Sequence, residues 1–369
     1  MVWLLLLIAG SVIHAATVPV EFTERVIATD LVGGSQVVIA DLNKDGKPDI
    51  ITIARNNTDL IWFENPSWKR RLLAVDLRRM SNVAARDVDG DGIPEVVVAH
   101  EFADQPAQSL GILSVLQHGD DPREPWKIAE IDRIPTSRRL RWADLFGNGS
   151  KVLVDAPLTG PKADDKTSIV LYKPGVWMRE TIPQPSEGAV RGIYITDWDA
   201  DGAEDILTAG YTGIHVIRRS KIGEWSRTEI VPTPAADVAA GWLGSKSVGT
   251  RFLTALSTQI FVFRQDNKGK WQQQTIEDTV LDGGAILTAD LNGDGSDEII
   301  AGYRGQSRGV NVYYANGNKT WTKYPLDSGG IAAADCAVAD LNANGRPDVV
   351  CIGSDSANLK WYDNKGPKK

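Results

Sequence analysis

The 369-residue sequence contains only two cysteines and four histidines. Two cysteines are too few to hold a small fold together by disulfide bonds, so burial of apolar side chains must stabilise this chain. Basic residues are also fewer than acidic ones, 40 against 48, which gives a formal net charge of −8. A nucleic-acid-binding protein needs a basic face to neutralise phosphates, so this balance argues against such a partner.

Long apolar runs are missing beyond the N-terminus. Residues 2–16 carry no charged side chain and include an apolar block that is too short to cross a bilayer comfortably. Small residues follow, with Ile13 and Ala15 suitably placed, so we predict a signal peptide over 1–15, although no Lys or Arg stands near Met1. We therefore expect a secreted or periplasmic protein without a stable membrane span. A short membrane anchor is the alternative.

What the sequence does have is an acidic motif that recurs along the rest of the chain. The first copy reads Asp-Leu-Asn-Lys-Asp-Gly-Lys-Pro-Asp over residues 41–49. Seven copies, of which the third and fifth are eroded, begin at Asp41, Asp87, Asp144, Asp197, Gly241, Asp290 and Asp340. Successive copies are 44 to 57 residues apart, so the period is close to 50 residues. Periods of this length are typical of propeller blades.

Short apolar runs surround each motif in the order that a blade requires. One run enters the motif and another leaves it, as at 36–40 and 50–53 in the first repeat. A third run follows, and a fourth opens on tryptophan in six repeats, at Trp68, Trp126, Trp177, Trp225, Trp271 and Trp321. Runs of four to six residues separated by Gly, Asn and Asp are strands. We predict an all-β fold, a single seven-bladed propeller over residues 18–366.

The two ends of the chain predict how the ring closes. The seventh repeat stops at Gly366 without its tryptophan-led strand. Residues 21–27 resemble that missing strand, with Phe22 in place of the tryptophan. The N-terminal strand would therefore complete the last blade and remove the open sheet edges, an exchange that a linear solenoid would not need.

The acidic motif has the chemistry of a calcium loop. Side chains at positions 1, 3 and 5 converge on one point, glycine at position 6 permits the turn, and positions 7 and 9 add a carbonyl and a carboxylate. Hard oxygen donors favour calcium, and the alternative is a solvated acidic turn without metal. We expect up to five ions, bound most weakly by the seventh repeat, which has only two carboxylates. The expected ligands are Asp41, Asn43, Asp45, Lys47, Asp49, Asp87, Asp89, Asp91, Ile93, Glu95, Asp197, Asp199, Asp201, Ala203, Asp205, Asp290, Asn292, Asp294, Ser296, Glu298, Asp340, Asn342, Asn344, Arg346 and Asp348.

The two cysteines, Cys336 and Cys351, flank the seventh motif on neighbouring predicted strands. If Ala339 faced Val349, the cysteines would lie nearly opposite each other. A disulfide would suit an exported protein, but cross-strand geometry is demanding, so the bridged and the free state both stay open.

These motifs are similar to FG-GAP and VCBS repeats, whose Asp-rich hairpin loops also occur in the propellers of integrin alpha subunits. The resemblance covers residues 18–366 and implies a seven-bladed propeller with calcium in the five intact loops. It does not extend the metal to the third and fifth repeats, where the pattern fails at Phe146, Val152 and Gly241. Related propellers include adhesion and ligand-binding modules, polysaccharide lyases and a sugar dehydratase, so the resemblance alone selects no single function.

In propellers of this type the calcium loops lie on one face, and ligands usually meet the other. The residues expected on that opposite face are Arg55, His100, Glu101, Arg138, Arg139, Arg191, Tyr211, Tyr303, Arg304 and Asp355. An arginine-rich funnel could hold a carboxylated or sulfated sugar, because guanidinium groups pair bidentately with such anions. The alternative is that these arginines are scattered and solvated.

We therefore expect an exported, calcium-stabilised module that binds carbohydrate or an extracellular protein without catalysis. The alternative is a lyase or dehydratase that acts on acidic sugars through the funnel, with His100 as a candidate base, although a lone histidine is more often structural. The five intact motifs hold 16 of the 48 acidic residues, so bound calcium would leave a mildly basic surface that suits an anionic glycan. The sequence fixes no oligomeric state, and a monomer is compatible with it.

Overall fold

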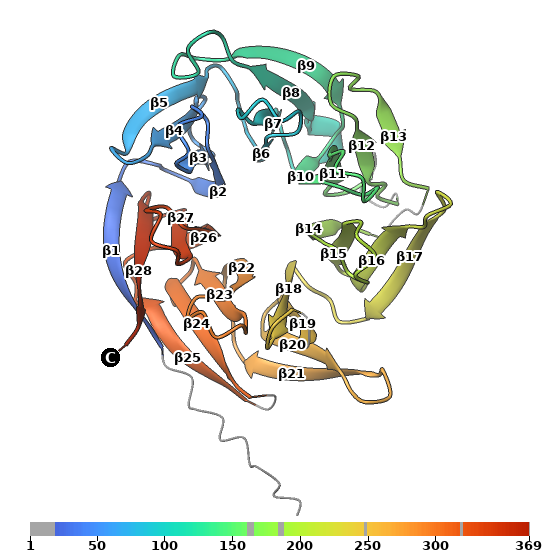
Figure 1. Cartoon of the computed structure of the whole chain (residues 1–369). Coiled ribbons are helices and arrows are strands. Elements are labelled where there is room, and N and C mark those ends of the chain that lie inside the picture. Colours follow the sequence, from blue (N-terminus) through green and yellow to red (C-terminus); the bar gives the residue numbers. More distant parts are fainter. Residues whose placement is uncertain (1–18, 161–165, 184–187, 247–248, 318–319, 369) are drawn as a thin grey trace, which may run out of the picture.

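The computed structural model describes residues 19–160, 166–183, 188–246, 249–317 and 320–368, and the predicted signal peptide lies outside them. These residues form seven four-stranded antiparallel sheets that surround one axis as the blades of a propeller (Figure 1). The predicted fold class and blade number are confirmed. Within the described residues, no helix is long and apolar enough to cross a membrane.

Each of the first six blades takes its strands from one continuous segment, ordered from the axis outward (Figure 1). Blades 1 to 3 consist of β2 (Gly34–Ala40), β3 (Asp49–Ala54), β4 (Leu60–Glu64) and β5 (Lys69–Ala74); β6 (Asn82–Arg86), β7 (Glu95–His100), β8 (Ile112–Gln117) and β9 (Lys127–Arg133); and β10 (Ser137–Ala143), β11 (Val152–Pro157), β12 (Val170–Tyr172) and β13 (Arg179–Thr181). Blades 4 to 6 consist of β14 (Val190–Thr196), β15 (Asp205–Gly210), β16 (Gly213–Arg219) and β17 (Trp225–Val231); β18 (Asp237–Leu243), β19 (Thr250–Leu256), β20 (Ile260–Gln265) and β21 (Trp271–Glu277); and β22 (Gly283–Ala289), β23 (Glu298–Tyr303), β24 (Gly309–Asn316) and β25 (Thr320–Asp327).

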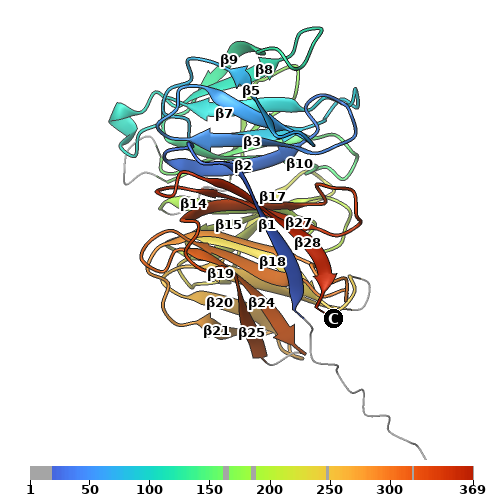
Figure 2. The same ribbon diagram turned by 90° about the vertical axis from the view of Figure 1, so that its left-hand side faces the viewer.

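Blade 7 joins the two ends of the chain. It combines β26 (Ala333–Ala339), β27 (Asp348–Gly353) and β28 (Leu359–Pro367) with the N-terminal strand β1 (Val20–Ala28). Strand β1 runs antiparallel to β28, with Val20 opposite Pro367, and Figure 2 shows the two strands side by side. The predicted closure is therefore confirmed. Phe22 takes the place of the tryptophan that lies near the start of the outer strand in the other blades. It stands two residues before Glu24, which faces Tyr362 of β28. In blade 5, Trp271 likewise stands two residues before Gln273, which faces Phe263.

The apolar core lies between blades rather than at one centre. The cluster between blades 7 and 1, for example, joins Val350 and Ile352 of β27 to Ile50 and Phe63 of blade 1. Second strands contribute most, because both of their faces pack on neighbouring sheets, and β3 and β11 are buried along their whole length. This explains why second strands read as continuous apolar runs and outer strands as mixed ones.

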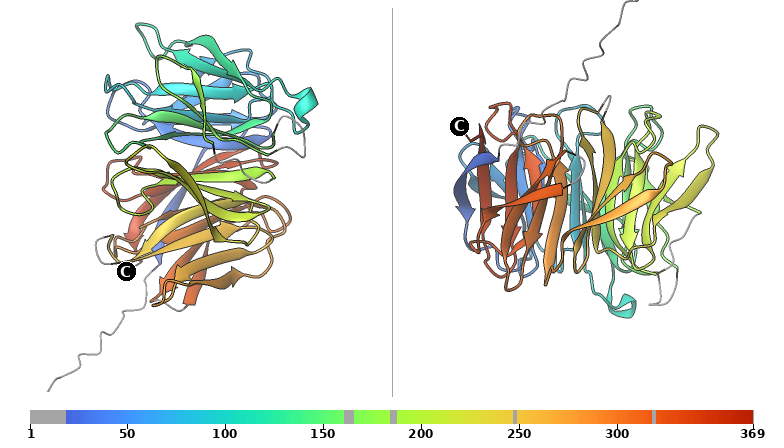
Figure 3. Two further views of the ribbon diagram at one scale, coloured as in Figure 1. Left: turned by 90° about the vertical axis from the view of Figure 1, so that its right-hand side faces the viewer. Right: turned by 90° about the horizontal axis from the view of Figure 1, so that it is seen from below.

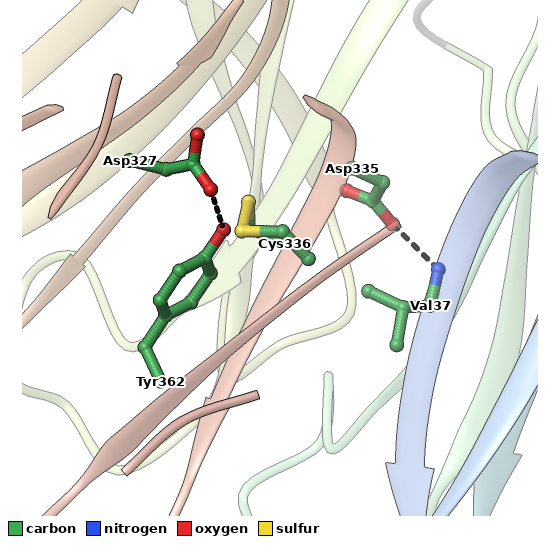
Figure 4. Close-up of a disulfide and its surroundings, with 6 residues drawn as sticks. Val37, Asp327, Asp335, Cys336 and Tyr362 are labelled. Carbon is green, nitrogen blue, oxygen red and sulfur yellow. Dashed lines mark hydrogen bonds between the residues drawn. A yellow bond between two sulfur atoms is a disulfide. The ribbon is translucent and has the colours of Figure 1, made fainter. Parts of the chain in front are cut away.

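Acidic side chains at the outer edge tie several blades together. Near the ends of outer strands, Asp132, Glu277 and Asp327 each accept a hydrogen bond from a tyrosine hydroxyl in the following blade, from Tyr172, Tyr313 and Tyr362 respectively. The same acids pair with cations of that blade, namely Arg179, Lys323 and Lys360. We call these contacts the outer ties. The tie to blade 7 is the most buried of the three, since Asp327 and Lys360 are 2% and 7% exposed. Figure 4 shows the Tyr362 hydroxyl at Asp327.

Two registers differ from expectation. In blade 7, Ala339 faces Asp348 rather than Val349, which puts Cys336 directly opposite Cys351, and the two form a buried disulfide with Cα atoms 4.1 Å apart (Figure 4). In blade 5, Leu243 faces Thr250, as Ala40 faces Asp49 in blade 1. The eroded fifth motif therefore begins at Gly244, not at Gly241, and is shorter than the others. The sequence hid this because the loop keeps no carboxylate to mark the register.

Candidate functional site

Two faces of the ring carry the predicted sites. The acidic motifs connect each first strand to its second strand, so they share one face, and neighbouring loops touch there, as where Lys44 Nζ donates to the carbonyl of Asp91. The opposite face is formed by the segments that enter first strands and leave second strands. A short 3-10 turn, η1 (Pro106–Gln108), follows β7 and projects from that opposite face (Figure 3).

The five intact acidic loops share one hydrogen-bonding pattern. The carboxylate at position 1 accepts the N–H of the position 6 glycine at 2.7 to 3.1 Å. The oxygen at position 5 accepts the N–H of position 7 at 2.7 to 3.0 Å. The position 6 glycines have φ between +79° and +94°, a region that glycine adopts without strain. Each motif therefore folds as a chain of tight turns with its oxygens gathered inside.

Carboxylate oxygens converge most closely in blades 2 and 4. Asp87, Asp89 and Glu95 lie with ligand oxygens within 4.8 Å of one another, and the equivalent set of blade 4 (197, 199 and 205) does the same. The position 9 carboxyl is the least exposed of the three in both blades, and it accepts the N–H of position 2 in all five loops. Burial raises the pKa of Glu298 to about 9. Such clusters of hard oxygens suit a divalent cation of the calcium type.

The eroded third loop keeps the fold of the intact ones with only part of their ligand set. Gly149 N–H donates to Asp144 at 2.7 Å, and Ser150 N–H donates to Asn148 at 3.0 Å, as in the intact loops. Phe146 and Val152 replace the oxygen donors at positions 3 and 9. The Nζ atom of Lys151 lies 3.7 Å from Asp144 and supplies positive charge instead. The turn geometry therefore does not depend on a full ligand set.

The fifth loop is stabilised by its neighbour. Asp297 of blade 6 accepts the N–H of Trp242 at 2.7 Å, and Ser296 accepts the N–H of Gly244 at 2.9 Å. The Arg251 guanidinium lies 4.7 Å from the centre of the Trp242 ring. Blades 3 and 5 thus use side-chain cations and neighbouring polar groups where the other loops gather acids.

On the opposite face, the structure brings four of the predicted arginines together. Burial and, after it, the neighbouring charges of Arg139, Arg55 and Arg191 together lower the pKa of Arg138 to about 10, and the charge of Asp104 opposes them. The four come from blades 1, 3 and 4 and therefore surround one side of the axis. Mutual repulsion of this kind is relieved by an anion.

An exposed tyrosine stands beside this cluster. Arg191 donates to the hydroxyl of Tyr211 at 3.1 Å, and its guanidinium lies 5.4 Å from the centre of the ring. Tyr211 is 62% exposed, so its ring is open to solvent. We call Arg55, Arg191 and Tyr211 the rim.

Sequence reasoning missed two aspartates that lie near these arginines. Arg139 and Arg141 of β10 are close enough for their charges to lower the pKa of Asp237 of β18 and Asp335 of β26, both of which burial raises, Asp335 to about 6. Arg141 and Asp335 line a cavity of about 390 Å³ between strands β2, β6, β10 and β26. We call Arg139, Arg141, Asp237 and Asp335 the throat. Their shared signal in the sequence is a charged residue within a first strand.

Other predicted members of the face lie inside their own blades. His100 is buried, with Nε2 3.0 Å from Ser114 Oγ, and burial lowers its pKa. The Tyr303 hydroxyl lies 2.6 Å from that of Tyr313, and Arg304 donates to Asp282 at 2.7 Å. Glu101 accepts a hydrogen bond from Arg79. Asp355 lies exposed in a turn.

Comparisons with known proteins agree with this geometry. A family model described as an FG-GAP-like repeat matches residues 41–98 and 290–351, which hold the loops of blades 1, 2, 6 and 7. The chain carries FG-GAP-like repeats. No curated protein matches it.

Solved propellers resemble the FG-GAP-like ring in fold. They include the Dos1 propeller (TM-score 0.58, 10% identity, 90% of this chain and 80% of that one covered). A lectin from Agrocybe aegerita that recognises non-reducing terminal N-acetylglucosamine has a TM-score of 0.53, 14% identity and coverages of 80% and 81%. The exotype rhamnogalacturonan lyase YesX has a TM-score of 0.50, 13% identity and coverages of 94% and 73%. At such low identity the likeness concerns the fold alone.

Proposed function

We propose that this propeller is an exported, calcium-stabilised module that binds an anionic carbohydrate without catalysis. The arginine cluster carries the proposal. Arg55, Arg139 and Arg191 repel Arg138, and the charge of Asp104 opposes them there. Holding like charges together costs free energy in the unbound protein, and a carboxylated or sulfated ligand offsets it through charge-assisted hydrogen bonds.

The rim favours a sugar among anionic ligands. Tyr211 offers an exposed flat ring beside the guanidinium of Arg191, so apolar stacking and charge pairing are available at one place. Two of the similar propellers, a lectin and a polysaccharide lyase, carry names that refer to carbohydrate. The disulfide and the predicted signal peptide support an oxidising compartment outside the cytoplasm.

A lyase that acts on acidic sugars is the alternative, and one observation favours it. Asp335 lies near Arg139 and Arg141, and burial raises its pKa to about 6, a range that suits a general base. The buried His100 is a poorer candidate, because its ring nitrogen faces Ser114 inside the blade.

The glycan proposal is tested with a panel of uronate-containing, sulfated and neutral polysaccharides. We expect saturable binding of acidic members only, weakened about tenfold or more by Arg191→Gln, since a charge-assisted contact is lost. Arg133→Gln, on the outer strand β9 and paired with Glu130, is the matched control and should bind like the parent protein. Unsaturated or shortened products would contradict the binding-only proposal and support the lyase. Absence of binding to any acidic glycan would reject both.

Calcium in the five intact loops is the second part of the proposal. Their residues fit the ion. The third loop keeps the turn with oxygens at positions 1 and 5 alone, so the turn does not explain why the five intact loops also retain oxygens at positions 3 and 9. Bound calcium would neutralise carboxylates that otherwise repel one another and would tie both strands of each hairpin.

Removal of calcium should lower the melting temperature, because an ion that binds only the folded state stabilises it. Melting is measured in excess calcium and in excess chelator. Asp199→Ser should shrink the difference between the two conditions, whereas Ser150→Ala in the eroded loop should leave it unchanged. Identical midpoints with and without chelator would refute the calcium assignment.

A further inference from the structure

A polar clamp joins three successive pairs of blades at the start of the first strand. Gln36 accepts the N–H of Val83 at 2.7 Å and donates to the carbonyl of the same residue at 3.0 Å. At the equivalent register position, Asn82 accepts the N–H of Leu140 at 2.9 Å. Asp335 accepts the N–H of Val37 at 3.1 Å (Figure 4). Each clamp side chain therefore caps a backbone donor of the next blade.

Arg139 breaks this series. It occupies the same register position in β10, opposite Ala156, as Gln36 does in β2, opposite Ile53. A guanidinium has no acceptor atom, so Arg139 cannot cap a backbone N–H of blade 4. Within the described ranges its side chain has no hydrogen bond or ion pair. Blade packing therefore does not account for an arginine at this position.

The surroundings of Arg139 suggest what it does instead. Its charge acts on the carboxyls of Asp237 and Asp335 and on the guanidinium groups of Arg138 and Arg141. Arg141 is held by Asn82 and by the carbonyl of Leu140, at 3.3 and 2.8 Å. Each aspartate accepts one backbone N–H and keeps further acceptor sites free. An unpaired cation thus stands beside two acceptors that have capacity to spare.

Resting on the proposed function, we infer that the throat takes the end of a uronic-acid chain: Arg139 binds the carboxylate of the terminal sugar, and Asp237 and Asp335 accept its hydroxyl groups. Two acceptors opposite one cation match a ring that carries one carboxylate and several hydroxyls. The aspartates also disfavour a sugar that carries several sulfate esters, because their carboxylates would repel the additional negative charges.

The position of the throat selects a chain end over a chain interior. Arg141 and Asp335 of the throat line the cavity of about 390 Å³, which is at the small end of ligand sites, about 300 to 1,000 Å³. Arg139 stands two residues before Arg141 in β10 and therefore on the same side of that strand, at the edge of the cavity. A polymer that lies across the face reaches the rim residues Arg55, Arg191 and Tyr211. Only a terminus that turns along the axis reaches Arg139 as well.

Titration with oligogalacturonates of increasing length tests this inference. We expect one propeller molecule to bind each oligogalacturonate, from the trimer to the polymer, because each glycan chain offers one matching end. Arg139→Gln should weaken binding of the trimer about tenfold or more and weaken binding of the galacturonate monomer by a similar factor. Arg191→Gln should weaken the trimer and leave the monomer within about twofold, since the rim contacts later sugars. Arg139→Lys, which keeps the charge but loses bidentate pairing, should lie in between.

The outcomes separate this inference from the broader proposal. If acidic glycans bind and Arg191→Gln weakens them, while Arg139→Gln has no effect or several propellers load on one chain, end-on recognition is overturned and the binding module stands. If no uronate binds but a sulfated glycan does, the inference is again overturned. If no acidic glycan binds, both fail. Melting curves of each variant, with Arg133→Gln as the surface control, separate lost binding from lost folding.

Discussion

Blade 7 is assembled from both ends of the chain and blade 3 from one continuous segment, yet blade 7 has the stronger internal contacts. Its outer strands β28 and β1 have nine residues each, whereas β12 and β13 of blade 3 have three each. Blade 7 also holds the disulfide and the most buried outer tie. Blade 3 holds a fully buried aspartate, Asp155, whose oxygens have no hydrogen-bond partner in the described structure.

The difference follows from where each blade stands. The ring can open at blade 7, so contacts that keep β1 and β28 together prevent the loss of the whole closed fold. Blade 3 contributes Arg138, Arg139 and Arg141, has an eroded acidic loop and carries Arg139 at the clamp position. Departures from the repeat pattern that lower stability tend to gather where a protein binds its ligand. Blade 7 therefore illustrates how the repeat stabilises the ring, and blade 3 how it can be altered for ligand recognition.

The largest expected effect comes from breaking the outer tie of blade 7. Asp327→Ala leaves Lys360 buried beside only the half-exposed Glu24. We expect a loss of about 3 kcal/mol in the free energy of unfolding, as for other buried pairs that lose one partner. Asp30→Ala, which breaks the exposed pair with Arg70 between blades 7 and 1, is the matched control and should cost under about 1 kcal/mol. Denaturant titration measures both, and equal losses would contradict the comparison.

The disulfide of blade 7 should have the next effect. It closes a loop of 15 residues, for which loss of cross-link entropy amounts to about 3 kcal/mol at most. Replacing Cys336 by Val and Cys351 by Thr copies the equivalent pair of blade 1, Val37 and Thr52, and so keeps the packing. We expect a lower unfolding midpoint without a change in fold. A midpoint equal to that of the parent protein would show that the hairpin is already constrained without the bridge.

The smallest effect is a gain in stability in blade 3. Burial raises the pKa of Asp155 to about 7 from its usual 3.8, and the charge of Asp132 adds to the rise while Ser137 and Arg179 oppose it. Between about pH 4 and pH 7 the unfolded chain loses this proton and the folded chain keeps it, so stability falls as pH rises through that window. Asp155→Thr copies Thr52 and Thr208 at the same register position.

We expect Asp155→Thr to raise the free energy of unfolding by about 1 to 3 kcal/mol at pH 8, because an unpartnered acid leaves the core. At pH 4 the gain should be small. Denaturant titration at both pH values measures the difference. The same gain at pH 4 and pH 8 would mean that packing rather than ionisation of Asp155 limits blade 3.

Much of the fold could be predicted because each blade repeats the same local rules. Glycine at position 6, alternating short strands and the leading tryptophan recur with a fixed spacing, so seven weak signals reinforce one another. Phe22 identified the closing strand for the same reason. Blade 5 was misaligned because its loop had lost the carboxylates that mark the register in the other repeats.

Contacts between distant blades could not be predicted in the same way. Asp237 and Asp335 come from two blades that lie far from β10 in sequence, and only the closed ring brings them near Arg139. The outer ties depend on which side of an outer strand an acid faces, and a shift of one residue reverses that side. His100 illustrates the limit, because it ends a second strand as predicted and yet its ring turns into the blade.

The pairing of β1 with β28 also sets an order of events in the cell. The ribosome produces β1 first and β28 last, and at about 5 to 20 residues per second the interval between them is on the order of tens of seconds. Throughout that time β1 has an unpaired edge, the kind of segment that chaperones shield from association with other chains. A chain that stops before β28 never acquires the partner for its first strand. Ring closure therefore distinguishes finished chains from unfinished ones.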